Sequence, residues 1–195
     1  MKKRVFIVHG WGGYPTEGWF PWLKDKLEAR GFEVLVPQLP DSDTPRIANW
    51  VGKLGKTVGK ADQNTYFIGH SLGCATIAYY LETLLDKIKV GGVVFVAGFF
   101  KRLTNIEDEP GNDETVAHWL KTPIDLKKVK SHLTKSIAIF SDTDPFVPLD
   151  NQDDFKNKLG SEIIIDRHKM GHFSGPTDKI TKLPIVLESI LKISK

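Results

Sequence analysis

Short runs of consecutive apolar residues alternate along the chain with longer stretches in which apolar residues recur every three or four positions. The runs are rich in β-branched and aromatic residues and are closed by Gly, Pro, Asp or Ser; they cover residues 4–10, 32–38, 65–71, 90–98, 136–142 and 161–168. Most are apolar at successive rather than alternate positions. This pattern is typical of strands buried on both faces of a parallel sheet.

The longer stretches between these runs predict helices. Their apolar spacing places the helices at residues 19–30, 45–58, 72–87, 149–159 and 179–192. Alternation of strands and helices predicts the α/β class, with a mostly parallel sheet of about six strands and helices on both faces. We find no repeat, low-complexity tract or linker, so we expect one compact domain over residues 1–195.

Residues 99–136 interrupt the alternation, because this connection is longer than an ordinary crossover. It contains an acidic, turn-forming stretch, EDEPGND, and a short helix candidate at residues 114–120. A long connection at the carboxyl ends of strands serves either as a small cap or lid, or as an elaborated crossover helix. The sequence leaves both interpretations open.

Composition restricts the class of protein further. Hydrophobic residues make up 41% and charged residues 26%, as in ordinary soluble globular proteins. The net charge of +3 is small and the basic residues are scattered, so we expect no nucleic-acid partner. The first apolar run, residues 5–8, is too short for a secretion signal or a membrane span. We therefore expect a cytoplasmic protein without a membrane partner.

The main candidate for chemistry is Ser71, in the sequence Gly69-His70-Ser71-Leu72-Gly73. It fits the pattern G-x-S-x-G and lies between a predicted strand and a predicted helix, which is the context that this motif requires. The tight corner exposes the serine hydroxyl, and the helix directs its first N–H groups towards developing negative charge. Ser71 is therefore the predicted nucleophile. The alternative is a glycine-flanked serine that caps a helix.

A serine nucleophile needs a histidine base, and the chain has six histidines. In enzymes with this motif the catalytic residues follow the chain order Ser, Asp, His. His172 lies in a glycine-bounded loop, KMGHFSGP, after the last predicted strand. It is the predicted base, and His168, at the end of that strand, is the nearest rival. His9 is interpreted as structural, and His70 is expected to point away from the nucleophile.

The orienting acid is expected after the run at residues 136–142, where the sequence SDTDPFVP offers Asp142 and Asp144. Asp144 precedes a turn that Pro145 and Pro148 make rigid, and a catalytic carboxylate needs that rigidity. Asp144 is therefore favoured to hold the histidine tautomer. Asp142 is expected to cap the turn, although the sequence does not exclude that it shares this role.

The first strand is followed by HGWGG, in which glycines allow the backbone to approach a ligand closely. The backbone N–H groups of Trp11 and Leu72 are the predicted donors of an oxyanion hole. HGWGG lacks the spacing of nucleotide-binding glycine loops.

The lone cysteine, Cys74, excludes an internal disulfide and a multi-cysteine metal site, and it is a poor alternative nucleophile. The predicted chemistry requires no metal and no organic cofactor.

These motifs together resemble those of α/β-hydrolases, and specifically of the small serine hydrolases in the retinoblastoma-binding-protein and YdeN-like family. The likeness extends over nearly the whole chain, through VFIVHGWGG, GHSLG, SDTDPFVP and GHF. It implies a compact α/β-hydrolase fold with a triad of Ser71, Asp144 and His172. Vertebrate members bind a partner through L-x-C-x-E, but this chain has threonine in place of the glutamate, at Thr76. The resemblance therefore does not imply that partner.

We expect a serine hydrolase that cleaves small carboxylic esters or related acyl compounds through an acyl-serine intermediate. Aromatic residues near the predicted strand ends are candidates to line an apolar pocket, although each is equally suited to the core: Trp11, Phe99, Phe100, Phe146 and Phe173. The alternative function is a protein-interaction module on a hydrolase scaffold, with secondary or vestigial activity. A complete set of catalytic groups argues against it, because binding alone requires none of them.

Overall fold

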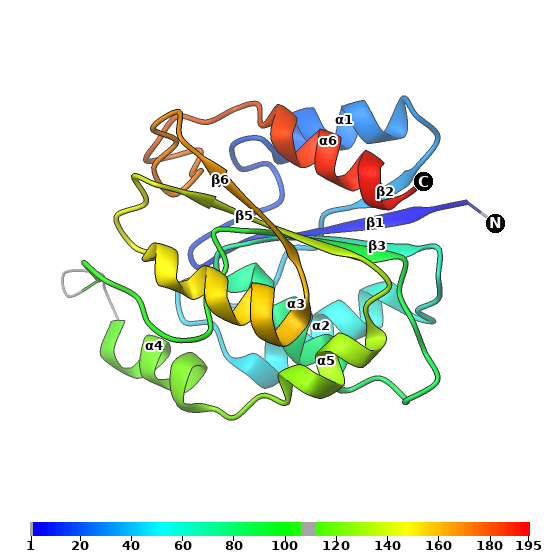
Figure 1. The fold of residues 1–195 in the computed structure, drawn as a ribbon, viewed down its shortest axis with the longest axis horizontal. Helices are drawn as coiled ribbons and strands as arrows, with labels where there is room; N and C mark the ends of the chain where they lie inside the picture. Colours follow the sequence, from blue (N-terminus) through cyan, green and yellow to red (C-terminus); the bar gives the residue numbers. More distant parts are fainter. Residues whose placement is uncertain (1, 107–111) are drawn as a thin grey trace.

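The protein, seen in a computed structural model that describes residues 2–106 and 112–195, is built on a six-stranded parallel sheet (Figure 1). This confirms the predicted α/β class. The order across the sheet is β2-β1-β3-β4-β5-β6. The strands are β1 (Arg4–Val8), β2 (Glu33–Leu35), β3 (Thr65–His70), β4 (Gly92–Val96), β5 (Ser136–Ser141) and β6 (Glu162–Asp166).

Helices cover both faces of the sheet, α1 and α6 on one and α2, α3 and α5 on the other (Figure 1). The helices are α1 (Phe20–Glu28), α2 (Ile47–Val58), α3 (Leu72–Glu82), α4 (Asn112–Lys121), α5 (Leu126–His132) and α6 (Pro184–Ile193). Within the described part of the chain, no helix has the length and apolar character needed to cross a membrane.

Strand β1 shows why the strands are apolar at successive positions. Val5 and Ile7 belong to the core beneath α1 and α6, whereas Phe6 and Val8 belong to the core beneath α2 and α3. Successive side chains of a strand point to opposite faces, so a sheet covered on both faces buries every residue of its central strands. The burial of both faces is what makes the strands recognisable in the sequence.

Strand register positions the functional region. β1 and β3 are neighbours, and Val8 lies opposite Gly69. Because parallel strands end at the same edge of the sheet, the loop after β1 and the corner after β3 lie side by side there. A β-carbon added to Gly10 would lie 3.0 Å from the β-carbon of Ser71.

Several helix boundaries differ from the predicted ones. The stretch predicted at residues 149–159 divides into a 3₁₀ turn, η1 (Leu149–Asn151), and a π-helical segment, η2 (Asp154–Leu159). The last helix begins at Pro184 instead of Lys179, since proline has a fixed φ and no N–H and therefore suits the first helical position. α3 ends at Glu82, five residues before its predicted end.

Residues 99–136 contain two helices, of which the sequence predicted only α4. Helix α5 packs against α3 and takes the place of a crossover helix between β4 and β5. Helix α4 is fixed to its neighbours by buried hydrogen bonds: Trp119 Nε1 donates to the Pro45 carbonyl, and Tyr79 Oη donates to the carbonyl of Trp119. Most of the acidic stretch EDEPGND lies outside the described residues.

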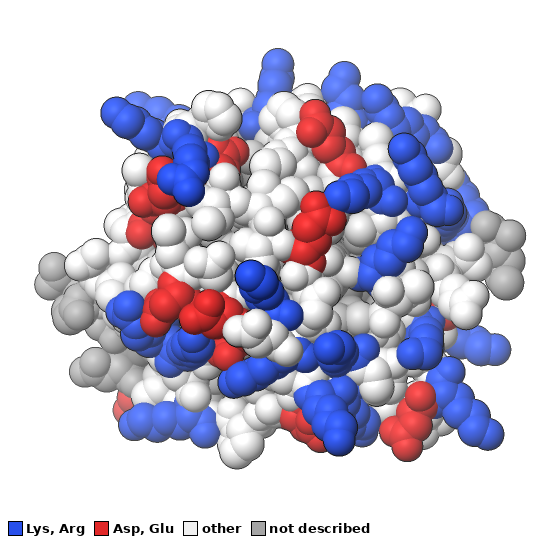
Figure 2. Space-filling model, in the orientation of Figure 1, with Lys and Arg blue, Asp and Glu red and all other residues white. Residues whose placement is uncertain are grey.

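Charged side chains are distributed over the surface without a single dominant patch in the view of Figure 2. Lys and Arg side chains are numerous on this face, and Asp and Glu side chains are interspersed among them. This distribution agrees with the small net charge of +3.

Candidate active site

Ser71 lies at a strained corner between β3, which ends at His70, and α3, which begins at Leu72. Its φ of 52° and ψ of −121° are unfavourable for a residue with a side chain. A β-carbon at Gly69 would lie 2.8 Å from the Cys74 nitrogen, and one at Gly73 would overlap the Val8 carbonyl oxygen. Both glycines are therefore required for the corner to form.

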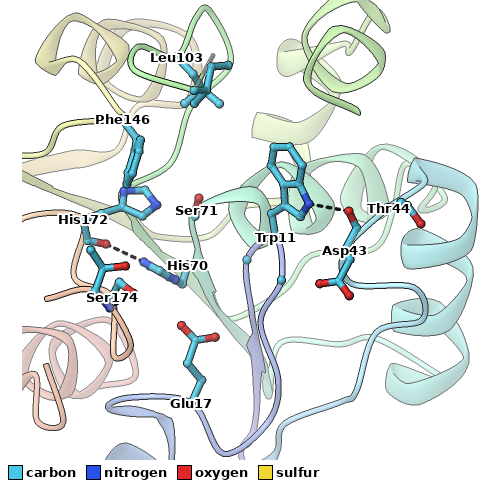
Figure 3. A pocket seen from close by; sticks show the side chains of 14 residues that line it. Trp11, Glu17, Asp43, Thr44, His70, Ser71, Leu103, Phe146, His172 and Ser174 are labelled. Carbon is cyan, nitrogen blue, oxygen red and sulfur yellow. Dashed lines mark hydrogen bonds between the residues drawn. The ribbon is translucent and has the colours of Figure 1, made fainter. Parts of the chain in front are cut away.

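A cavity of about 530 Å³ opens above this corner, and Ser71, His172 and Trp11 are among the residues that line it. Its two ends differ in chemistry (Figure 3). Trp11, Leu103 and Phe146 lie at one end, and Glu17 and Ser174 lie at the other, with Ser71 between them. The cavity therefore offers an apolar wall and a polar wall on either side of the serine.

His172 and Asp144, which are far apart in sequence, form a buried pair. His172 Nδ1 lies 2.8 Å from Asp144 Oδ2, and their side chains are only 12% and 2% exposed. The other Asp144 oxygen accepts the backbone N–H groups of Phe146 at 2.9 Å and Val147 at 3.0 Å. Asp144 therefore has a fixed orientation, and a proton on His172 Nδ1 leaves Nε2 as an acceptor.

The imidazole of His172 lies beside the Ser71 hydroxyl in the cavity (Figure 3). Among the described residues, no hydrogen bond joins the two side chains. In the absence of substrate, such catalytic hydrogen bonds are often long and tighten only in the complex. The structure thus brings together the three residues that the sequence singled out.

The rival candidates lie in different surroundings. His168 is 88% exposed and pairs through Nδ1 with Asp166 at 2.8 Å. Asp142 is exposed as well. The expectation that Asp142 caps the turn is wrong, because other side chains accept the N–H groups of the turn. Ser141 Oγ accepts the Thr143 N–H, and Asp144 Oδ1 accepts the Phe146 N–H. Neither rival lines the cavity.

Cys74 packs beneath the serine corner and is fully buried. Its Sγ lies 3.2 Å from the carbonyl oxygen of Gly69 and 3.4 Å from that of Val96. Burial raises the pKa of this thiol far above its usual range, so no thiolate is present at neutral pH. The structure therefore argues against Cys74 as a nucleophile.

The backbone of His172 is held from two sides by residues whose role the sequence did not indicate. Asp178 Oδ2 accepts the N–H groups of His172 and Ser174, each at 2.9 Å. His70 Nε2 donates to the His172 carbonyl at 2.8 Å (Figure 3). Burial, followed by the proximity of His172, lowers the pKa of His70 to about 3, so His70 stays neutral. The only sequence signal for Asp178 is an acid in a glycine- and proline-rich loop.

Replacing Asp178 with alanine is expected to lower kcat about tenfold, because two N–H groups lose their acceptor and the loop that carries His172 loosens. Asp178→Asn, which keeps an acceptor oxygen, should restore most of this loss. Steady-state kinetics and thermal unfolding of both variants test the prediction. Equal kcat in Asp178→Ala and the unmodified protein would contradict it.

The predicted oxyanion donors lie at the edge of this corner. Leu72 is the first residue of α3, and the first N–H groups of a helix have no partner within it. In the loop after β1, Gly12 N–H donates to Ser42 and Gly13 N–H donates to Gly10. Within the described part of the chain the Trp11 N–H has no such acceptor. Trp11 and Leu72 thus both have an N–H available to a ligand.

Three of the predicted pocket residues lie elsewhere. Phe173 is fully buried in the core beneath α1 and α6, and Phe99 is 3% exposed in the opposite core. Phe100 is partly buried against that opposite core, where its ring stacks on Phe155. None of the three lines the cavity around Ser71, whereas Trp11 and Phe146 do. Phe173 directly follows His172 but points the opposite way into the core, where Trp19 Nε1 donates to its carbonyl.

Glu17 is a further cavity residue that the sequence did not single out. It lies in the loop between β1 and α1, where nothing in the local pattern distinguishes it from a surface acid. Across residues 2–106 and 112–195, no group of three or more His, Cys, Asp and Glu side chains is arranged to hold a metal ion.

Comparison with known proteins agrees with this geometry. The putative hydrolase YdeN of Bacillus subtilis is 30% identical over 188 residues, which cover 96% of this chain and 94% of YdeN. Its crystal structure superposes with a TM-score of 0.85, 29% identity and 98% of each chain covered. The serine hydrolase RBBP9 of Rattus norvegicus is 29% identical over 175 residues, or 88% of this chain and 87% of RBBP9.

A carboxylesterase structure from Nitrososphaera gargenis shares the fold at only 14% identity, with a TM-score of 0.75 over 99% of this chain and 91% of the other. The model of the serine hydrolase family matches residues 5–187, which is most of the chain. Taken with the relatives above, this match shows that the chain belongs to the serine hydrolase family.

Proposed function

We propose that the protein hydrolyses small carboxylic esters or related acyl compounds through an acyl-serine intermediate. The observation that carries this proposal is the buried pair of His172 and Asp144 beside the strained Ser71 corner. Burying a hydrogen-bonded carboxylate and straining a serine both cost stability. Binding alone requires neither, whereas nucleophilic catalysis requires both. The apolar end of the cavity suits a short acyl chain.

The reaction begins with attack of Ser71 Oγ on the ester carbonyl carbon. His172 Nε2 takes the serine proton, and Asp144 stabilises the imidazolium that forms. The carbonyl oxygen gains negative charge and is stabilised by the N–H groups of Trp11 and Leu72. His172 then gives its proton to the leaving alkoxide, which departs as an alcohol. His172 then takes a proton from a water molecule, whose oxygen attacks the acyl-serine; the bond to Ser71 Oγ breaks, His172 returns the proton to Oγ, and the acid is released.

The size of the cavity gives a test of the substrate range. We expect p-nitrophenyl acetate and butyrate to be hydrolysed, and kcat/KM to fall about tenfold or more for the dodecanoate, because the apolar end is only one part of a cavity of about 530 Å³ and a long chain must extend beyond it. Initial rates over the acyl series measure this. His168→Ala is the control and should retain the activity, because His168 is exposed and outside the cavity. Absence of hydrolysis across the series would favour the interaction-module alternative.

A further inference from the structure

The charge of the cavity is opposite to that of the chain. The chain carries a net charge of +3, but the cavity lining includes two carboxylates, Glu17 and Asp43, and no Lys or Arg from the described residues. Asp43 is exposed, so water screens its charge. Glu17 is only 8% exposed and directs its carboxylate towards the space between Ser71 and Ser174 (Figure 3).

The Glu17 carboxylate has unused capacity to accept hydrogen bonds. The Tyr14 backbone N–H donates to it, and within the described part of the chain no side chain donates a hydrogen bond to it or forms an ion pair with it; His172 interacts with it only electrostatically. A carboxylate offers about four acceptor positions. Burial raises the pKa of Glu17, which reflects the cost of holding this charge away from water. A cation from the ligand would offset that cost.

We propose that Glu17 forms a subsite for a cationic group in the alcohol part of the substrate, so that esters of protonated amino alcohols are preferred. This inference rests on the ester hydrolysis proposed above. His172 must reach the leaving oxygen of the ester, so the alcohol part lies on the His172 side of Ser71. Glu17 lines the same cavity and is close enough to His172 for the two groups to interact electrostatically, so a group on the alcohol part can reach Glu17. The apolar end, with Leu103 and Phe146, is left for the acyl chain.

A pair of isosteric esters tests the subsite. 2-(Dimethylamino)ethyl acetate is protonated at neutral pH, and 3-methylbutyl acetate has the same shape with carbon in place of the charged nitrogen. We expect kcat/KM for the cationic ester to exceed that for the neutral one by about tenfold or more. In Glu17→Gln the ratio should fall to about one. Asp43→Asn, the matched control at an exposed acid of the same cavity, should keep most of the preference.

A different role for Glu17 gives a different result. If Glu17 only stabilised the His172 imidazolium, Glu17→Gln would slow both esters equally and the ratio would not change. That outcome, or a ratio near one in the unmodified protein, would overturn the inference and leave ester hydrolysis intact.

A binding measurement separates the subsite from catalysis. Calorimetry with Ser71→Ala, which cannot turn over either ester, should show tighter binding of the cationic ester, and Ser71→Ala combined with Glu17→Gln should lose that difference. Failure of the proposed function would instead appear as no Ser71-dependent hydrolysis of either ester. Even then, equal binding of both esters to Ser71→Ala would overturn the subsite.

Discussion

Ser71→Ala is expected to abolish covalent labelling by a fluorophosphonate probe and to reduce ester hydrolysis on the order of 10⁴-fold or more. Such probes react with an activated serine, and removal of Oγ deletes the atom that forms the new bond. His172 and Asp144 would then have no nucleophile to activate. Gel detection of the probe and steady-state hydrolysis of p-nitrophenyl acetate measure the two effects.

The fold should survive this change. Alanine removes one oxygen and keeps the β-carbon, so the strained φ of 52° remains as it is. We expect a thermal midpoint within a few degrees of the unmodified protein. Cys74→Ala is the matched control, because Cys74 lies one turn along α3 and is fully buried; it should keep the labelling. Labelling that persists in Ser71→Ala would disprove the assignment of the nucleophile.

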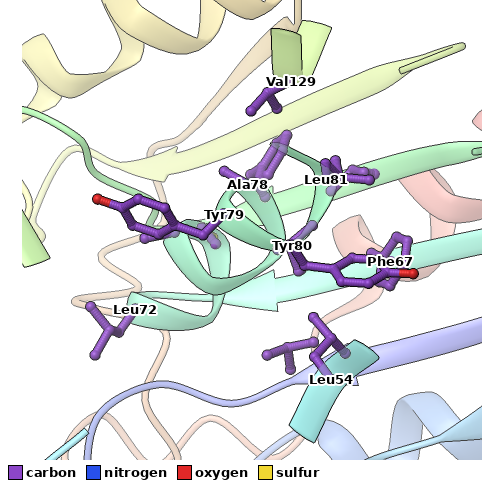
Figure 4. Packing of buried hydrophobic residues seen from close by; sticks show 14 of the residues in the cluster. Leu54, Phe67, Leu72, Ala78, Tyr79, Tyr80, Leu81 and Val129 are labelled. Atoms are coloured by element: carbon purple, nitrogen blue, oxygen red, sulfur yellow. The ribbon is translucent and has the colours of Figure 1, made fainter. Parts of the chain in front are cut away.

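The sequence predicted the sheet and the Ser71 corner well because their physical requirements are local. Residues 72–81 of α3 are all buried (Figure 4), so the helix is apolar on most sides and begins where the motif ends. In Figure 4, Tyr80 lies against Phe67 of β3, and Leu54 of α2 and Val129 of α5 belong to the same core around the helix. Where burial is continuous, the pattern of apolar residues is sufficient to locate an element.

The parts that the sequence missed depend on contacts between distant loops. Asp178, His70 and Glu17 are polar residues whose function arises only when the loops after β1, β3 and β6 meet. The same limit explains why Phe173 was wrongly predicted to line the cavity. It follows His172 in sequence, but its backbone, at a φ of 57°, directs its side chain into the core. Adjacency in sequence does not determine which side of the sheet a loop residue faces.

The second large effect is expected on turnover, when an aspartate in the turn after β5 is replaced with asparagine. Asp144→Asn is expected to lower turnover by about 10⁴, the size of the equivalent change in the serine proteases. Asp144 Oδ1 accepts two backbone N–H groups, so the asparagine oxygen is expected to remain there and to turn the amide NH₂ towards His172. The imidazole must then accept at Nδ1 and carry its proton on Nε2, where it cannot take the proton of Ser71.

The stability of Asp144→Asn should change little, because the oxygen that holds the turn is kept. Asp142→Asn is the matched control: it makes the same chemical change two residues away, on an exposed side chain outside the cavity, and should alter neither turnover nor the thermal midpoint appreciably. Turnover and thermal unfolding of the two variants, measured side by side, decide between them. An inactive, folded Asp142→Asn together with an active Asp144→Asn would move the orienting acid to Asp142. That result would also require the turn to rearrange, since Asp144 is the residue that contacts His172 here.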